Sequence, residues 1–179
     1  MDEFIERLRR ARIGATFNFY RDGAGAAIRC ERLCAYLKAR AQAPLLLVGE
    51  AAGYRGARVS GIPFTSERQL TGSGPAEATA TIVRRVLAEL GIEEQTLCWN
   101  VVPTHPHLPA RPDTNRRPTR EEVATSRRFL DDLAHGRQVV AVGRLAERWL
   151  GPPAVRHPSH GGAVAFLEGL GELCGQLPH

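Results

Sequence analysis

Four short apolar runs alternate with segments of helical periodicity along the chain. The first run, Leu45-Leu46-Leu47-Val48-Gly49, is apolar throughout, which is typical of a strand covered on both faces of a parallel sheet. Further strands are predicted over residues 96–102, 139–143 and 154–157. Helical spacing and capping signals such as Thr119-Arg120-Glu121-Glu122 predict helices over residues 3–12, 26–41, 77–90, 119–134, 145–150 and 163–173.

This alternation of strands and helices predicts an α/β fold. It favours a parallel sheet with helices on both faces, and therefore a three-layer α/β/α sandwich. The length of 179 residues suits one domain over residues 1–179 that is large enough to bury a substantial core.

The basic charge of the chain comes almost entirely from arginine. The formal net charge is +5, and Lys38 is the only lysine. Guanidinium groups suit bidentate contact with phosphate, so nucleic acid is a natural partner. Composition alone leaves open the alternative that the arginines reflect the base composition of the gene and form a solvated face.

Features of membrane and secreted proteins are missing from the sequence. No run approaches the ~18 apolar residues of a membrane span, and the first seven residues lack the order of a signal peptide. We expect a cytoplasmic monomer with no membrane partner. In a reducing cytosol the four cysteines should be buried free thiols rather than disulfides or a metal site; they are Cys30, Cys34, Cys98 and Cys174.

Three of the predicted strands are followed by residues with distinct chemistry. Phe64 lies in the long loop predicted from Gly49 to Gly74 after the first strand, Asn100 lies at the end of the second, and His157-Pro158-Ser159 follows the fourth. Ligands bind at the carboxyl ends of strands in open parallel sheets. A stacking ring, a side-chain amide and a histidine at this edge predict a pocket for a flat heterocycle.

Four motifs in this order resemble those of the uracil-DNA glycosylase superfamily over about residues 44–170. They are Gly49-Glu50-Ala51-Ala52-Gly53, Trp99-Asn100-Val101-Val102, Asn115-Arg116-Arg117-Pro118 and His157-Pro158-Ser159. The resemblance implies a four-stranded sheet in the order 2-1-3-4, numbered along the chain. It also implies hydrolysis of the N-glycosidic bond of deoxyuridine in single- or double-stranded DNA, which leaves an abasic site in base excision repair. No cofactor is expected.

The resemblance also implies a role for each motif residue. Phe64 would stack on uracil, and the Asn100 amide would pair with uracil N3–H and O4. His157 would donate to uracil O2 as negative charge develops there. The remaining uracil-binding candidates are Gly49, Ala51, Gly53 and Tyr54, and the DNA-binding candidates are Ser159, His160, Arg55, Arg58, Arg116 and Arg117.

The departures from the family pattern leave alternatives open. Ala51 stands where other branches have a water-orienting side chain, so Glu50 and Asn115 are the catalytic candidates beside His157. Gly53 replaces a tyrosine that excludes thymine. Thr104 and Ser126 stand where the iron-sulfur branch has two of its cluster cysteines, so no cluster and no metal site is expected.

Three other functions compete with a uracil-DNA glycosylase. The first is a uracil-DNA binding protein with little turnover, because Ala51 cannot orient water. The second is a glycosylase for deaminated purines, hypoxanthine or xanthine, permitted by the space at Gly53. A small nucleotide-binding protein without a DNA role is disfavoured, since the chain has no glycine-rich phosphate fingerprint.

Overall fold

The computed structural model describes residues 1–175 and contains the predicted parallel sheet. Four strands pair in the order β3-β2-β5-β6, which is the order 2-1-3-4 expected from the resemblance. Their bounds are β2 (Leu45–Ala51), β3 (Thr96–Val102), β5 (Gln138–Val142) and β6 (Ala154–Val155). The α/β fold is therefore confirmed. The last four residues of the predicted domain lie outside the described residues.

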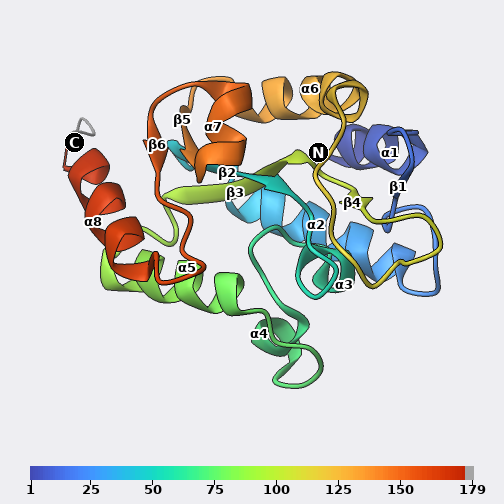
Figure 1. Cartoon of the computed structure of the whole chain (residues 1–179), viewed down its shortest axis with the longest axis horizontal. Helices are drawn as coiled ribbons and strands as arrows, with labels where there is room; N and C mark the ends of the chain where they lie inside the picture. The colour runs from blue at the N-terminus through green and yellow to red at the C-terminus, as the bar shows by residue number, and fades with distance from the viewer. Residues whose placement is uncertain (176–179) are drawn as a thin grey trace.

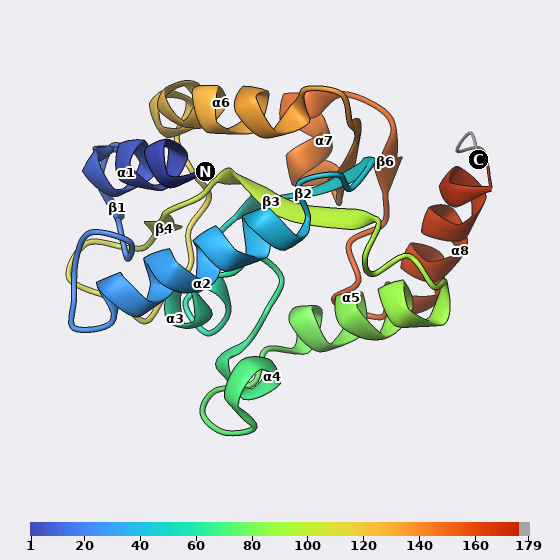
Figure 2. The ribbon, with the colours of Figure 1, turned by 180° about the vertical axis from the view of Figure 1, so that it is seen from behind.

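Helices cover both faces of this sheet (Figures 1 and 2). On one face lie α1 (Asp2–Arg10), α6 (Arg120–Ala134) and α7 (Arg144–Leu150), and on the other α5 (Ala78–Glu89) and α8 (Ala163–Cys174). Alternate residues of β2 supply the two buried clusters. Leu46 and Val48 pack in the cluster with α1 and α6, whereas Leu45 and Leu47 pack in the cluster with α5 and α8.

The helix α2 (Ala26–Ala39) runs beside the edge strand β3. The hydroxyl of Tyr36 accepts the backbone N–H of Cys98 at 2.7 Å, and the Tyr36 ring packs against both buried clusters. An edge strand otherwise leaves unpaired backbone groups open to other chains. This helix thus covers the edge of the sheet.

Short elements that the sequence did not predict lie within its loops. The predicted loop from Gly49 to Gly74 contains α3 (Ala57–Ser60) and α4 (Glu67–Thr71). Two segments far apart in the chain, β1 (Thr16–Phe17) and β4 (His105–Pro106), pair as an antiparallel ladder. Strands of two residues are too short to show a periodic pattern.

The cysteines are less buried than the sequence suggested. All four are free thiols, but only Cys98 is buried. Cys30 and Cys34 lie on α2 and are partly exposed. The Cys30 thiol donates to the Tyr20 carbonyl, and the Cys34 thiol donates to the Asp2 carboxylate. The expectation of burial is therefore wrong for Cys30, Cys34 and Cys174. Within residues 1–175 no group of three or more His, Cys, Asp or Glu could hold a metal ion, and no helix there has the length and apolar character to cross a bilayer.

Candidate active site

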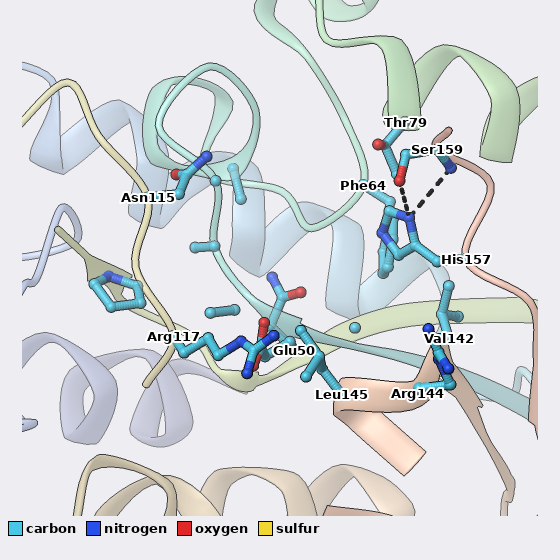
Figure 3. A pocket seen from close by; sticks show the side chains of 18 of the residues that line it. Glu50, Phe64, Thr79, Asn115, Arg117, Val142, Arg144, Leu145, His157 and Ser159 are labelled. Carbon is cyan, nitrogen blue, oxygen red and sulfur yellow. Dashed lines mark hydrogen bonds between the residues drawn. The ribbon is translucent and has the colours of Figure 1, made fainter. Parts of the chain in front are cut away.

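A cavity of about 630 Å³ opens at the carboxyl edge of the parallel sheet. Its walls come from the ends of β2, β3 and β5, the loop before α6, the start of α5 and the segment between β6 and α8 (Figure 3). Most of the residues predicted for the site meet here. They are Gly49, Glu50, Ala51, Gly53, Phe64, Asn100, Asn115, Arg116, Arg117, His157, Ser159 and His160.

Phe64 and Asn100 approach each other over Gly49. Gly49 and Asn100 are partners in the ladder between β2 and β3. A Cβ on Gly49 would lie 2.6 Å from Cζ of Phe64 and 2.9 Å from Oδ1 of Asn100, which is closer than real Cβ atoms come. Glycine at this position therefore lets a ring and an amide converge. Among residues 1–175 the Asn100 side chain has no hydrogen-bond partner, although the residue is buried, so its donors and acceptor are available to a ligand.

The backbone of Phe64 is held in an unusual conformation. Its φ of 53° lies in the left-handed region, which is rare for a bulky residue and costs free energy. A hydrogen-bonded turn maintains it, since the buried Ser60 hydroxyl contacts the carbonyls of Ile62 and Thr65, and Tyr20 donates to the Gly61 carbonyl at 2.9 Å. Strain of this kind points to a function for the direction in which the ring is held.

Hydrogen bonds decide which nitrogen of His157 carries the proton. The Ser159 backbone N–H donates to Nδ1 at 3.2 Å, and the Ser159 hydroxyl lies 2.7 Å from the same atom (Figure 3). Because a backbone N–H can only donate, Nδ1 must be the acceptor, and the neutral ring carries its proton on Nε2. Burial lowers the pKa of His157, and the nearby His160 and Arg156 lower it further. A neutral imidazole with a free Nε2–H donor thus lines the cavity.

Glu50 brings a carboxylate to the same cavity. Burial raises the pKa of Glu50 above its usual value, while Arg117 and Arg148 oppose that rise. Figure 3 shows the Arg117 guanidinium beside the Glu50 carboxylate. Neither oxygen has a hydrogen-bond partner within the described part of the chain. A carboxylate with a raised pKa and free lone pairs is suited to accept a proton.

The loop before α6 is anchored by an ion pair between a half-buried arginine and a buried glutamate. Arg116 donates to both carboxylate oxygens of the fully buried Glu122, at 2.8 and 2.6 Å. Burial alone would raise the pKa of Glu122, but the Arg116 guanidinium and the Thr119 N–H hold it below its usual value. Arg116 also donates to the carbonyls of His107 and Arg117. All three guanidinium nitrogens are thus engaged, so the structure gives Arg116 an anchoring role in place of the predicted phosphate contact.

Two further contacts join this loop to the segment after β2. The Asn115 Oδ1 accepts the backbone N–H of Tyr54 at 3.0 Å. The buried His105 lies between two carbonyl oxygens, with Nδ1 2.9 Å from that of Ala52 and Nε2 3.2 Å from that of Pro112. These contacts fix the distance between two walls of the cavity.

A family model described as the Uracil DNA glycosylase superfamily matches residues 38–173, which include every element of the cavity. The chain belongs to the uracil-DNA glycosylase superfamily. Members of this superfamily are DNA glycosylases that act in base excision repair. No curated protein matches the chain.

The fold is also similar to that of a solved structure. The crystal structure of wild-type Pedobacter heparinus SMUG2 matches with a TM-score of 0.72 and 15% sequence identity. The match covers 97% of this chain and 96% of that chain. At this identity the likeness shows a shared fold and leaves the substrate open.

Three residues expected in this glycosylase site lie outside the cavity lining. Tyr54 contributes its backbone N–H to Asn115 and not its ring to the pocket. The Arg55 guanidinium lies 5.3 Å from the centre of the Tyr54 ring, and that of Arg58 lies 5.6 Å from the Phe17 ring. These aromatic contacts occupy both arginine side chains. The prediction placed them in the site because no signal in the sequence shows which side of a loop faces a ligand.

Sequence reasoning also missed one wall of the glycosylase cavity. The end of β5 and the start of α7 supply Val142, Gly143, Arg144, Leu145 and Arg148. Gly143 has a φ of +85°, and a Cβ there would lie 2.8 Å from Cβ of His157. The available signal was topological: in a parallel sheet the third strand must end at the same edge as the other three.

Proposed function

We propose that the protein hydrolyses the N-glycosidic bond of deoxyuridine in DNA, releasing uracil and leaving an abasic site. One observation carries this proposal. The Phe64 ring and the Asn100 amide converge over Gly49 in the same cavity that contains the Nε2–H of His157. A stacking surface, an amide that binds the edge of the base and a donor to the leaving base are three of the parts that this reaction requires.

Recognition of uracil follows from the free amide of Asn100. Its carbonyl accepts N3–H of uracil, and its NH₂ donates to O4. Cytosine presents an amino group in place of O4, so a buried donor would face a donor at a cost of ~1–3 kcal/mol. Stacking on Phe64 contributes a further ~1–3 kcal/mol without reading the sequence.

Cleavage transfers an electron pair from the sugar to the base. As the bond between C1′ and N1 breaks, positive charge develops on the sugar and negative charge on uracil. The Nε2–H of His157 donates to uracil O2, and this bond strengthens as the charge grows. His157 acts here as a neutral donor, since Ser159 occupies Nδ1 as a donor to the ring.

A water molecule completes the reaction by bonding to C1′. We assign Glu50 as the group that takes its proton, because the carboxylate lines the cavity and has a raised pKa. The Asn115 oxygen accepts the Tyr54 N–H, and a neutral amide can hold a water by hydrogen bonds but is too weak a base to take its proton. The released uracil anion then takes up a proton.

Replacing either base-contacting residue should impair uracil release. Asn100→Ala and Phe64→Ala each remove an interaction of ~1–3 kcal/mol, so we expect kcat/KM to fall by about 5- to 150-fold. Single-turnover cleavage of a uracil-containing oligonucleotide measures this, with circular dichroism to confirm the fold. Leu70→Ala on α4 is the control, because Leu70 is exposed and does not line this cavity. Wild-type turnover by Asn100→Ala or Phe64→Ala would remove that residue from the pocket.

Acid should inactivate the enzyme through two groups. Glu50 must be ionised to accept a proton, and its pKa is raised above 4.5. His157 must be neutral for Nδ1 to accept from Ser159, and its pKa is lowered below 6.5. Both requirements fail as pH falls, so the single-turnover rate should be constant near neutrality and decline between pH 6.5 and 4.5. A rate that increases on acidification in this window would contradict both assignments.

One substrate panel tests the proposed function directly. The purified protein is incubated with oligonucleotides that carry uracil, hypoxanthine or xanthine, in single- and double-stranded form, and abasic sites are then cleaved with alkali. We expect cleavage at uracil. Tight binding to uracil-DNA without cleavage would support the alternative of a binding protein with little turnover.

A second candidate, a glycosylase for deaminated purines, is favoured by the space around Gly53. A Cβ built on Gly53 meets no heavy atom within 4 Å. A tyrosine at this position would narrow the pocket, and its absence leaves room for a bicyclic base. Cleavage at hypoxanthine or xanthine in preference to uracil would establish this candidate in the same panel. The cytoplasmic location and the monomeric state stay predictions from the sequence.

A further inference from the structure

Four arginines with free guanidinium groups surround the mouth of the cavity. They come from three separate parts of the chain: Arg117 from the loop before α6, Arg144 and Arg148 from α7, and Arg156 from the segment after β6. All four are exposed. Within residues 1–175 none of these guanidinium groups donates a hydrogen bond or lies in an ion pair.

Most of the other arginines have a protein partner, which is a carboxylate, a backbone carbonyl or an aromatic ring. Examples are the pairs Arg7–Asp132, Arg32–Glu67, Arg40–Glu94 and Arg127–Asp131. The two carboxylates that line the cavity do not form such pairs with the four arginines, and that of Glu77 accepts the backbone N–H of Ala80 at the start of α5. Glu50 offsets part of the charge of Arg117 and Arg148, but the four arginines outnumber the two carboxylates, so the cavity mouth keeps an excess of positive charge that favours an anionic ligand. Guanidinium groups without a protein partner are suited to bind phosphate.

The spacing of the α7 pair suits a phosphate backbone. Arg144 and Arg148 are four residues apart, so they lie on the same side of the helix, about 6 Å apart along its axis. Both line the cavity that would receive the target base. The backbone of a nucleotide whose base enters this cavity must pass along its mouth, where the four guanidinium groups are.

We propose that Arg144 and Arg148, together with Arg117 and Arg156, bind the phosphates of the DNA strand that carries the target nucleotide. This inference rests on the proposed function for its ligand, DNA, and does not depend on which base is cleaved. In this proposal these four arginines take the place of Arg55, Arg58 and Arg116 as the main phosphate contacts. The side chains of those three residues are engaged by Tyr54, Phe17 and Glu122, respectively.

The salt dependence of DNA binding tests this assignment. The probe is a single-stranded oligonucleotide without uracil, and a duplex of the same sequence serves as a second arm. Each phosphate contact contributes about 0.7 to the slope of log K against log salt for a single strand, so the double variant Arg144→Ala/Arg148→Ala should lose about 1.4 of that slope. Between 50 and 200 mM salt, the affinity of the wild type should therefore fall by about sevenfold more than that of the variant.

A matched control separates a local contact from net charge. Arg84→Ala/Arg85→Ala removes the same charge from α5, and neither residue lines the cavity. Its slope should stay close to that of the wild type, and thermal unfolding confirms that all variants fold. An unchanged slope for the α7 variant, an equal change in the control, or a change seen only with duplex DNA would each overturn the proposal. If the expected slopes are found but no base is released from any substrate, the proposed function fails and the strand contact stands.

Discussion

His157→Ala is expected to lower kcat for uracil release by about 100- to 1000-fold, which corresponds to ~2.7–4 kcal/mol of transition-state stabilisation. The physical reason lies in the hydrogen bonds of the ring. Ser159 occupies Nδ1, so the proton is on Nε2, where it can donate to the leaving base. This bond strengthens as charge develops, so its loss raises the barrier more than it weakens binding of the intact substrate.

Single-turnover cleavage and equilibrium binding to uracil-DNA, measured side by side, check this expectation. Asn100→Ala is the comparison, because Asn100 contacts the base before and during cleavage and its loss should reduce both binding and rate. His135→Ala is the control for loss of an imidazole, since His135 follows α6 and does not line the cavity. If His157→Ala binds far more weakly yet cleaves at the normal rate when saturated, His157 is a binding residue and the mechanism is wrong.

Arg116→Ala is expected to lower the free energy of unfolding by about 3–5 kcal/mol, the cost of leaving a buried charge without its partner. The partner is Glu122, whose side chain is 1% exposed and accepts two hydrogen bonds from Arg116. Gly14 packs so closely on Glu122 that a Cβ there would lie 2.5 Å from its Cγ, so the carboxylate cannot move to solvent without disturbing the segment before β1.

Urea unfolding at neutral pH measures the loss, with Arg117→Ala as the neighbouring control. Arg117 is exposed, so its removal should change stability by no more than about 0.5 kcal/mol. The pKa of Glu122 is depressed in the folded state, so the pair stabilises the protein above pH 4.5 and this contribution is lost as pH falls through the lower folded value. The difference between wild type and Arg116→Ala should therefore shrink in acid. A stable Arg116→Ala protein with weakened DNA binding would restore the phosphate contact inferred from sequence.

Much of the fold could be predicted from the sequence, because local patterns determine it. The run Leu45-Leu46-Leu47-Val48 is typical of a strand that is covered on both faces, and it forms the inner strand β2. The capping residues Thr119 and Glu122 begin α6 as their spacing indicates. Since parallel strands end at one edge of a sheet, Gly49, Asn100 and His157 had to come near one another.

The orientation and the partners of the site residues were decided only by the tertiary structure. The partner of the Arg116 guanidinium was not evident in the motif, where Arg116 and Arg117 are adjacent and alike. Arg116 is half-buried and pairs with the buried Glu122, whereas Arg117 is exposed. The third strand ended in residues of ordinary composition, yet α7 places Arg144 and Arg148 at the cavity mouth. Hydrophobic periodicity indicates which positions along a helix or strand face the core. It carries no information on which distant backbone atom lies beside a polar side chain, and those contacts determine proton position, charge and access at this site.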